Sequence, residues 1–161
     1  VEDVACARIV QVPDPERVVA LTQTTLSVDD TSQIVQVLEE RFPHLVTRNG
    51  ICYATANRQA AAKALAREVQ LVLVIGAQNS SNCNRLREVA EAEGVPAYLI
   101  NGPADVQDEW LEGVERVGIT SGASTPERLV QEVVARLKPA RVRNIEVAKE
   151  DISFALPTAL R

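Results

Sequence analysis

The 161-residue chain contains no methionine, one histidine and one tryptophan, and aromatic residues make up only 3% of it. With the single histidine, His44, the chain cannot by itself supply chemistry that needs several histidines. Its three cysteines, Cys6, Cys52 and Cys83, form no Cys-x-x-Cys pair, so their spacing does not predict a self-contained zinc or iron–sulfur site. Walker-type and Gly-x-Gly-x-x-Gly loops are also absent, which removes the sequence signature of ordinary nucleotide binding.

Other absences concern location and partners. No apolar stretch is long enough to span a membrane and no signal peptide opens the sequence, so we expect a cytoplasmic protein, or a stromal one in a plastid-bearing organism. The odd number of cysteines fits a reducing compartment. Net charge −5 and pI ≈ 5.0 argue against a general nucleic-acid-binding surface. Because translated chains normally begin with methionine, we expect a sequence that opens with Val1 to be an excerpt or a processed product.

The most informative stretch that is present joins an apolar strand to a polar loop and a helix. Residues 71–75 are wholly apolar and end at Gly76, which predicts a strand buried on both faces of a parallel sheet. Hydroxyl and amide side chains follow, before a helix predicted over 85–93. Open α/β folds bind ligands at this position, and backbone N–H groups at a helix start favour anions. The loop therefore suits phosphate or diphosphate, although similar loops also cap helices in proteins that bind no ligand.

Apolar periodicity extends this alternation along most of the chain. We predict caps at three helix starts: Ser27, in capping-box spacing with Asp30; Thr55; and Thr125, ahead of Pro126. The predicted strands cover 18–22, 51–54, 71–75, 97–100 and 116–120, and the predicted helices cover 29–42, 56–69, 85–93, 105–111 and 126–137. Strands and helices that alternate in this way predict an α/β fold with a mostly parallel sheet.

Two segments suggest where this alternation is interrupted. The turn sequence at 47–50 predicts a boundary between two regions. The last helix ends at Lys138 and Pro139, and the tail beyond it contains short alternating runs at 145–147 and 152–156. We interpret these runs as edge strands or as a C-terminal clasp.

Cys52 has the most suggestive context of the cysteines. It lies in the predicted strand over 51–54, directly before a predicted helix. A thiol beside a helix N-terminus favours the thiolate, which is the form that ligates a metal or attacks a substrate. The alternative is a small buried hydrophobic residue, which is the usual state of a lone cysteine in an apolar segment. Cys83, just after the Ser-Ser-Asn loop, is expected to face the interior.

Four segments keep their order along the chain and carry a family resemblance. They are TQTTLSVDD at 22–30, ICYATANRQ at 51–59, NSSNCNRL at 79–86 and GITSGASTPE at 118–127, and DVQDEW at 105–110 fits with them. Together they resemble the 4-hydroxy-3-methylbut-2-enyl diphosphate reductase family (LytB/IspH) over most of the chain. Four motifs in register are far more specific than any one of them.

The resemblance implies the last step of the non-mevalonate isoprenoid route. The family removes the hydroxyl of an allylic diphosphate with two electrons and protons, giving isopentenyl and dimethylallyl diphosphate. It implies a 4Fe–4S cluster held by three cysteines, whose open iron can act as a Lewis acid and an electron donor. It also implies an electron-donor protein such as ferredoxin or flavodoxin.

The resemblance also implies roles for individual residues. Cys52 falls on the third cluster cysteine, and Thr24 falls on a threonine near the substrate hydroxyl and the proton-delivery network. The residues on or beside diphosphate-binding positions are Ser80, Ser81, Asn82 and Ser124. Because the family fold has three α/β lobes, we expect 1–50 to be the later part of a middle lobe, 51–137 the C-terminal lobe and 138–161 a tail.

The chain departs from the family by lacking recognisable counterparts of an earlier segment. In the family that segment carries the other two cluster cysteines, three substrate-contacting histidines and a proton-transferring glutamate, and neither Cys6 nor His44 sits in a matching motif. We therefore expect the isolated chain to hold no stable cluster and to have no reductase activity. Two alternatives are a cluster-free diphosphate- or anion-binding module and a redox-inactive remnant that serves as an interaction domain.

Overall fold

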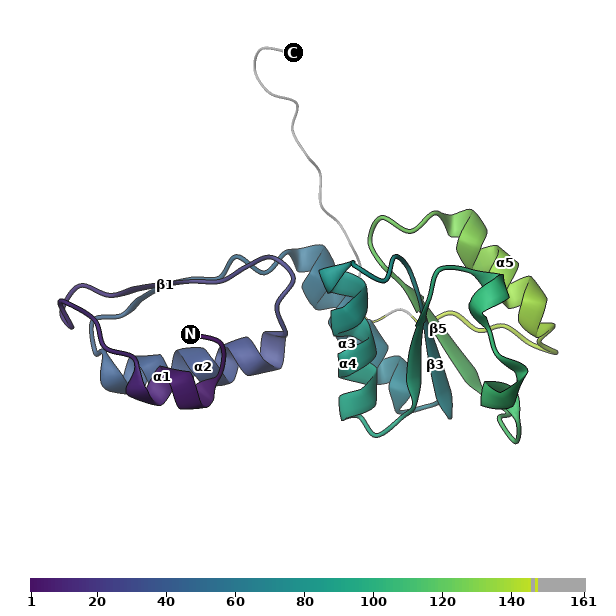
Figure 1. Ribbon diagram of the computed structural model, residues 1–161, viewed down its shortest axis with the longest axis horizontal. Coiled ribbons are helices and arrows are strands. Elements are labelled where there is room, and N and C mark those ends of the chain that lie inside the picture. The colour runs from purple at the N-terminus through teal and green to yellow at the C-terminus, as the bar shows by residue number, and fades with distance from the viewer. Residues whose placement is uncertain (146, 148–161) are drawn as a thin grey trace, which may run out of the picture.

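The computed structural model describes residues 1–145 and 147, and it contains two α/β lobes that lie side by side along the longest axis (Figure 1). The first lobe runs from α1 to β2 and the second from α3 to α5. Every strand pair in these lobes is parallel, which confirms the predicted fold class. Within the described residues, no helix combines the length and the apolarity needed to cross a membrane.

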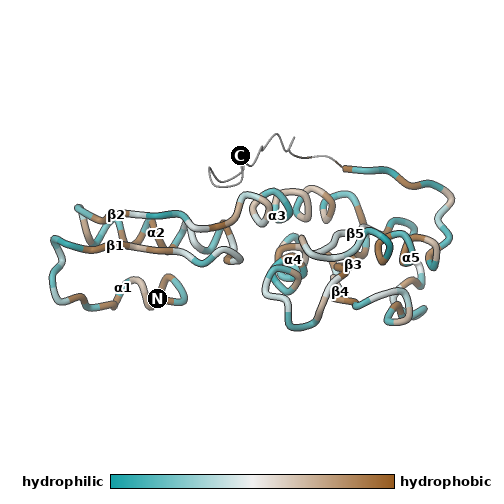
Figure 2. Tube along the Cα trace, turned by 90° about the horizontal axis from the view of Figure 1, so that it is seen from above, coloured by the Kyte–Doolittle hydropathy of each residue, from teal (hydrophilic) through white to brown (hydrophobic). Residues whose placement is uncertain are grey.

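The first lobe is a two-stranded sheet with helices on one face. Its elements are α1 (Val4–Ile9), β1 (Val19–Leu21), α2 (Val28–Arg41) and β2 (Val46–Arg48). Ala7, Leu38 and Phe42 form its buried core. Ser27 caps α2 as predicted, because its Oγ accepts a hydrogen bond from the Asp30 N–H at 3.2 Å. In Figure 2, α2 alternates between apolar and polar colours along its length, as expected of a helix with one buried face.

The second lobe is a three-stranded sheet with helices on both faces. Its elements are α3 (Tyr53–Ala66), β3 (Leu71–Ile75), α4 (Ser81–Ala92), β4 (Ala97–Ile100), the 3-10 helices η1 (Pro103–Asp105) and η2 (Asp108–Leu111), β5 (Val117–Ser121) and α5 (Glu127–Leu137). The strand order is β4-β3-β5, and all five residues of the central β3 are buried. Val72 and Val74 pack toward α3 and α4, whereas Leu71, Leu73 and Ile75 pack toward α5. The prediction of a strand buried on both faces is confirmed.

Several predicted boundaries were wrong. The run at 51–54 is not a strand: α3 begins at Tyr53 and Cys52 occupies its N-cap position, so Thr55 lies in the first turn instead of capping the helix. A short apolar run does not distinguish a strand from the start of a buried helix. The predicted turn at 47–50 instead begins inside β2, where pairing with β1 overrides the local turn preference.

Three other helix predictions need correction. α4 begins at Ser81, four residues before the predicted start, because Ser80 caps it. Thr125 does not cap α5; Pro126 takes that position, and the Thr125 hydroxyl donates to the carbonyl oxygen of Ile75. The helix predicted over 105–111 is replaced by η1 and η2, and α1 was not predicted. Of the tail runs, 152–156 lies outside the described residues, and 145–147 is described only at its ends.

Candidate functional site

Two polar loops meet at the carboxyl end of the second-lobe sheet. Ile75 and Ser121 are paired in register at the ends of β3 and β5, so the loops that follow them start side by side. The Gly122 N–H donates to the Ile75 carbonyl oxygen at 3.0 Å, and the Thr125 hydroxyl donates to the same oxygen at 2.9 Å. One carbonyl at the end of the central strand therefore anchors the second loop.

Both loops close over the buried sulfur of Cys83. A Cβ atom added at Gly76 would lie 2.3 Å from the Cys83 Sγ, and one added at Gly122 would lie 2.5 Å from it. Real Cβ atoms essentially never come this close to another heavy atom, so the space requires glycine at both positions. Cys83 is thus a packing residue beneath the loops, which confirms that it faces the interior.

The start of α4 contains a buried amide without a partner. The Nδ2 and Oδ1 atoms of Asn82 are both inaccessible to solvent and have no hydrogen-bond partner in the described structure. Leaving a buried polar group unsatisfied costs about 1–3 kcal/mol, so such a group calls for an explanation. The Nδ2 atom lies 3.9 Å from where a Cβ on Gly122 would stand, which places the amide between the two loops.

The surroundings of this amide suit an anion. Ser80 caps α4 through its Oγ, which accepts from the Cys83 N–H at 3.3 Å, and Ser81 is exposed in the first turn. Ser124 is exposed on the facing loop. The first turn of α4 carries no acidic residue, so its N–H groups are not neutralised by a carboxylate. The structure therefore places Ser80 at the N-cap and Ser81 and Asn82 in the first turn of α4, and Ser124 on the loop after β5.

Thr24 and Cys52 form a second group, at the junction of the two lobes. The Cys52 N–H donates to the Thr24 carbonyl oxygen at 3.1 Å, although the two residues are 28 positions apart. The Cys52 side chain makes no capping hydrogen bond, is half-buried and is a free thiol. Thr24 is exposed. Asp30 at the start of α2 pairs with Arg85 of α4 at 3.6 Å, which links this junction to the helix that begins at the polar loops.

The three cysteines lie far apart, and only Cys52 occupies a helix N-cap position. Among the described residues, no group of three or more His, Cys, Asp or Glu side chains is arranged to hold a metal ion. Cys83 is buried under the glycines, and Cys6 lies on α1 in the first lobe. The thiols of the described residues are therefore not gathered into a set that could hold a metal centre.

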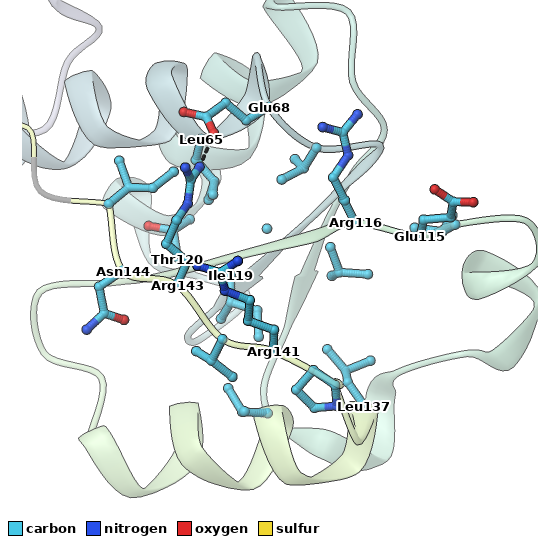
Figure 3. Close-up of a pocket in the computed structure, with 18 of the residues that line it drawn as sticks. Leu65, Glu68, Glu115, Arg116, Ile119, Thr120, Leu137, Arg141, Arg143 and Asn144 are labelled. Carbon is cyan, nitrogen blue, oxygen red and sulfur yellow. Dashed lines mark hydrogen bonds and ion pairs between the residues drawn. The ribbon is translucent and has the colours of Figure 1, made fainter.

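A separate cavity of about 980 Å³ lies between α3, β5, α5 and the segment at 139–145 (Figure 3). Arg116, Arg141 and Arg143 are among its lining residues, and Arg143 forms an ion pair with Glu68. None of the predicted site residues lines it. Its arginines make it a rival location for an anion, but its polar groups include no buried side chain without a partner like that of Asn82.

Comparison with known proteins decides the family. The model of the family described as "LytB protein" matches residues 1–138. The chain belongs to the LytB family. It is 49% identical over 166 residues to the 4-hydroxy-3-methylbut-2-enyl diphosphate reductase of Azoarcus sp. (strain BH72), covering 100% of the chain and 53% of that relative. The enzyme of the same name from Actinobacillus pleuropneumoniae serotype 5b is 52% identical over 146 residues, covering 88% of the chain and 46% of the relative.

Solved structures agree with this assignment to the LytB family. The E-1-hydroxy-2-methyl-but-2-enyl-4-diphosphate reductase from Plasmodium falciparum aligns with a TM-score of 0.89 and 35% identity, covering 99% of this chain and 52% of that one. A second structure, of (E)-4-hydroxy-3-methyl-but-2-enyl diphosphate reductase, aligns with a TM-score of 0.53 and 36% identity, covering 76% and 44%. The chain thus spans about half the length of the relatives it matches, and the resemblance seen in its motifs is confirmed.

One buried residue of a matching segment was not singled out from the sequence. Gln59 is only 2% exposed, and its carboxamide bonds to the backbone of the loop that carries Thr24. The available signal was a long polar side chain in an alanine-rich helix, since alanines occupy positions 60–62, 64 and 66.

Proposed function

We propose that this chain forms the part of a 4-hydroxy-3-methylbut-2-enyl diphosphate reductase that holds the substrate's diphosphate and supplies one cluster thiolate. The reaction is the reductive dehydroxylation of the allylic alcohol to isopentenyl and dimethylallyl diphosphate. It consumes two electrons and two protons and releases water. The observation that carries this proposal is the buried, unpartnered carboxamide of Asn82 between two polar loops.

A diphosphate oxygen would give the donor end of that amide a partner. The Asn82 Nδ2 can donate to a phosphate oxygen, and the hydroxyls of Ser80, Ser81 and Ser124 can donate from the rim of the two loops. The first-turn N–H groups of α4 add positive potential at the same place. Because the anion site is built from hydroxyls, an amide and backbone, it recognises phosphate geometry with no cation that would need desolvation.

Thr24 and Cys52 would act at the other end of the substrate. Their backbone hydrogen bond keeps the threonine close to the thiol, so the Thr24 hydroxyl can hold a proton near the leaving hydroxyl. When bound, a 4Fe–4S cluster supplies the electrons and a Lewis-acidic iron. We assign Cys52 as one of its ligands. The other ligands would come from the part of the longer relatives that has no counterpart in this chain.

The same proposal includes the division into lobes, the electron donor and the cellular compartment. We assign 1–50 to the later part of a middle lobe, 51–137 to the C-terminal lobe, and 138–161 to a tail. The electron donor would be a ferredoxin or a flavodoxin. The reducing cytoplasm, or the plastid stroma, would keep the three free cysteines as thiols.

Substitution of Asn82 tests the diphosphate site. In the longest native polypeptide that contains this chain, Asn82→Ala should weaken binding of the diphosphate substrate by about 1.5–3 kcal/mol, roughly 10- to 150-fold, because a hydrogen bond to a charged group is lost. Calorimetric titration measures this. Arg143→Ala is the matched control in the rival cavity and should leave the affinity unchanged. Unchanged affinity in Asn82→Ala with an intact fold, or a loss confined to Arg143→Ala, would overturn the assignment.

The cluster is tested separately. Anaerobic reconstitution should give iron, sulfide and a visible iron–sulfur spectrum in the complete enzyme, and Cys52→Ser should lose or degrade the cluster. The isolated 161-residue chain should hold no stable cluster and show no reductase activity. The incomplete ligand set of the described residues makes a cluster-free anion-binding module the second candidate. Diphosphate binding without iron in the complete protein would favour that module, and failure of both would indicate a remnant that serves only as an interaction domain.

A further inference from the structure

The Gln59 side chain bridges the two lobes through one buried carboxamide. Its Oε1 accepts a hydrogen bond from the Val28 N–H at 3.0 Å, and its Nε2 donates to the Leu26 carbonyl oxygen at 2.8 Å. Because the group of Val28 that meets the amide is an N–H donor and that of Leu26 is a carbonyl acceptor, these partners fix which end of the amide is oxygen. The side chain comes from α3 in the second lobe, and both partners lie where the first-lobe loop enters α2.

This carboxamide takes the place of a neighbouring strand. Ser27, the residue between its two partners, has an extended backbone, with φ −63° and ψ 129°. In an extended segment the carbonyl before a residue and the N–H after it point the same way, as in a parallel ladder. Gln59 satisfies both groups at once. Removing its amide would leave a part-buried carbonyl and a part-buried N–H without this partner, which costs free energy to the extent that water cannot replace it.

The same face of α3 holds the loop at three successive points. Gln59 lies seven positions after Cys52 and Lys63 lies eleven after it, so all three fall within about 20° of one helix face. Cys52 bonds to Thr24, Gln59 to Leu26 and Val28, and Lys63 to Asp29, in matching order along the two segments. The segment at 24–29, which consists of the loop before α2 and the start of its first turn, therefore runs along α3.

Of these three contacts, only that of Gln59 is made by a buried side chain. The Lys63 and Asp29 side chains are 28% and 55% exposed, and exposed ion pairs contribute little to stability. The Cys52 contact joins backbone to backbone and has no side-chain support. Among the contacts made by α3 itself, Gln59 therefore supplies the buried side-chain hydrogen bonds to this loop; ahead of α3, the Thr22 Oγ also accepts a hydrogen bond from the Gly50 N–H at 2.6 Å.

We propose that Gln59 is a positioning residue that sets where Thr24 stands relative to Cys52. This proposal rests on the proposed function for the roles of Thr24 and Cys52. The register of the loop on α3 is independent of that function. With the amide in place, Thr24 and Cys52 are held at one end of a loop pinned about two helical turns further along α3. Without it, the loop can shift along α3 and the hydroxyl moves away from the thiol.

Hydrogen exchange of the full chain tests the register without assuming any activity. Gln59→Leu keeps the size of the side chain and removes both hydrogen bonds. The amides of Val28 and Cys52 should exchange at least tenfold faster, whereas those of β3 should keep their protection. Lys63→Ala is the matched control on the same helix face and should leave the Val28 and Cys52 amides as in wild type. Unchanged exchange at Val28 and Cys52 in Gln59→Leu would overturn the proposal.

Gln59→Glu provides a second variant should Gln59→Leu fail to fold. A protonated carboxyl can donate to Leu26 and accept from Val28, but a carboxylate can only accept. Protection of the Val28 and Cys52 amides should therefore rise as the pH falls, in Gln59→Glu and not in wild type. The charged groups that face this position, Asp29, Asp30, Lys63 and Arg85, are the same in both proteins, so their titration cancels in the comparison. A pH dependence equal to that of wild type would contradict the assigned contacts.

Kinetics of the complete enzyme test the consequence for catalysis. Gln59→Leu should lower kcat by about 10- to 100-fold, because small displacements of catalytic groups have effects of this order, and should leave KM nearly unchanged because the diphosphate loops are untouched. Faster exchange with an unchanged kcat would overturn the positioning role. Failure of the proposed function would be seen instead in Asn82→Ala, whose diphosphate affinity does not depend on Gln59.

Discussion

The second lobe buries its central strand completely, whereas the first lobe leaves one face of its sheet exposed. The residues of β3 are at most 2% exposed, but Val19 and Leu21 of β1 are 58% and 76% exposed, and Val46 of β2 is 50% exposed. The helices account for the contrast. In the second lobe α3 and α4 cover one face and α5 the other, whereas α1 and α2 pack only on the inner face of β1.

This contrast shows that the two lobes are stabilised differently. A parallel sheet is stable when both faces are covered, and a two-stranded sheet alone is marginal. The first lobe has a small core of its own, and its contacts with α3, including the buried Gln59 amide, add to that core. The second lobe has a core that does not require the first.

The largest effect expected from this comparison comes from core truncation. Leu73→Ala removes a fully buried side chain from β3 and should cost about 2–5 kcal/mol of unfolding free energy. The matched change in the first lobe, Leu38→Ala, should cost less, about 2 kcal/mol, and should lower hydrogen-exchange protection only in that lobe. Urea denaturation with exchange measurements compares the two. Equal loss of protection across both lobes in Leu38→Ala would show that they unfold as one cooperative unit.

A second prediction compares the lobes in function. Thr24→Val, in the first lobe, should reduce turnover on the order of 10²-fold with little change in substrate affinity, because the hydroxyl is proposed to act in proton delivery. Asn82→Ala, in the second lobe, should show the opposite pattern. Steady-state kinetics and titration on the complete enzyme separate kcat from affinity. An equal turnover number in Thr24→Val would remove that residue from the proton path.

The third prediction concerns the packing of the second lobe at its loops. Gly122→Ala places a methyl group against the Cys83 sulfur and should cost about 1–3 kcal/mol, as overpacking in a core does. In a Cys83→Ala background the same change should cost clearly less, because the sulfur is gone. Thermal unfolding of the four proteins of this double-mutant cycle measures the coupling. Additive effects would show that the glycine is not required by the sulfur.

The smallest expected effect is a pH dependence of amide hydrogen exchange in α1 of the first lobe. The Cys6 N–H donates to the Asp3 carboxylate at 2.6 Å and holds the pKa of that carboxyl below its ordinary value of 3.8. A carboxyl whose folded pKa is depressed stabilises the fold above the unfolded value, and that contribution is lost as the pH falls through the folded pKa. Exchange at the Cys6 and Ala7 amides should therefore accelerate below pH 3.8 relative to β3. Asp3→Asn should abolish this dependence while keeping a capping side chain.

The parts of the fold that the sequence predicted are those decided by local pattern. The wholly apolar run at 71–75, which ends at a glycine, predicted the buried strand β3, and Ser27 showed its capping role through its spacing from Asp30. The start of α3 was missed because Ile51 and Cys52 suit a strand as well as a buried helix start. β2 was missed because turn residues follow it, and its pairing partner lies 27 positions earlier.

The candidate site divides in the same way. The polar segment that follows β3 could be predicted because an apolar strand gives way to small polar residues, but its last residues, Ser81 and Asn82, belong to the first turn of α4. The contacts of Gly76 and Gly122 with Cys83, and of Gln59 with the loop before α2, could not, because they join segments far apart in the chain. Long-range contacts of this kind leave only weak local traces, such as the single glutamine on a helix of alanines.

The Gln59 bridge also determines where the protein can be divided for study. The turn sequence places a boundary at Gly50, but the segment at 22–28 crosses it, because Thr22 is bonded to Gly50, Thr24 to Cys52, and Leu26 and Val28 to Gln59. A fragment that begins at Ile51 would expose the Gln59 amide to water and leave the Cys52 N–H without its acceptor. Any split of the enzyme into separately produced halves should therefore keep the loop, α2 and α3 on one polypeptide.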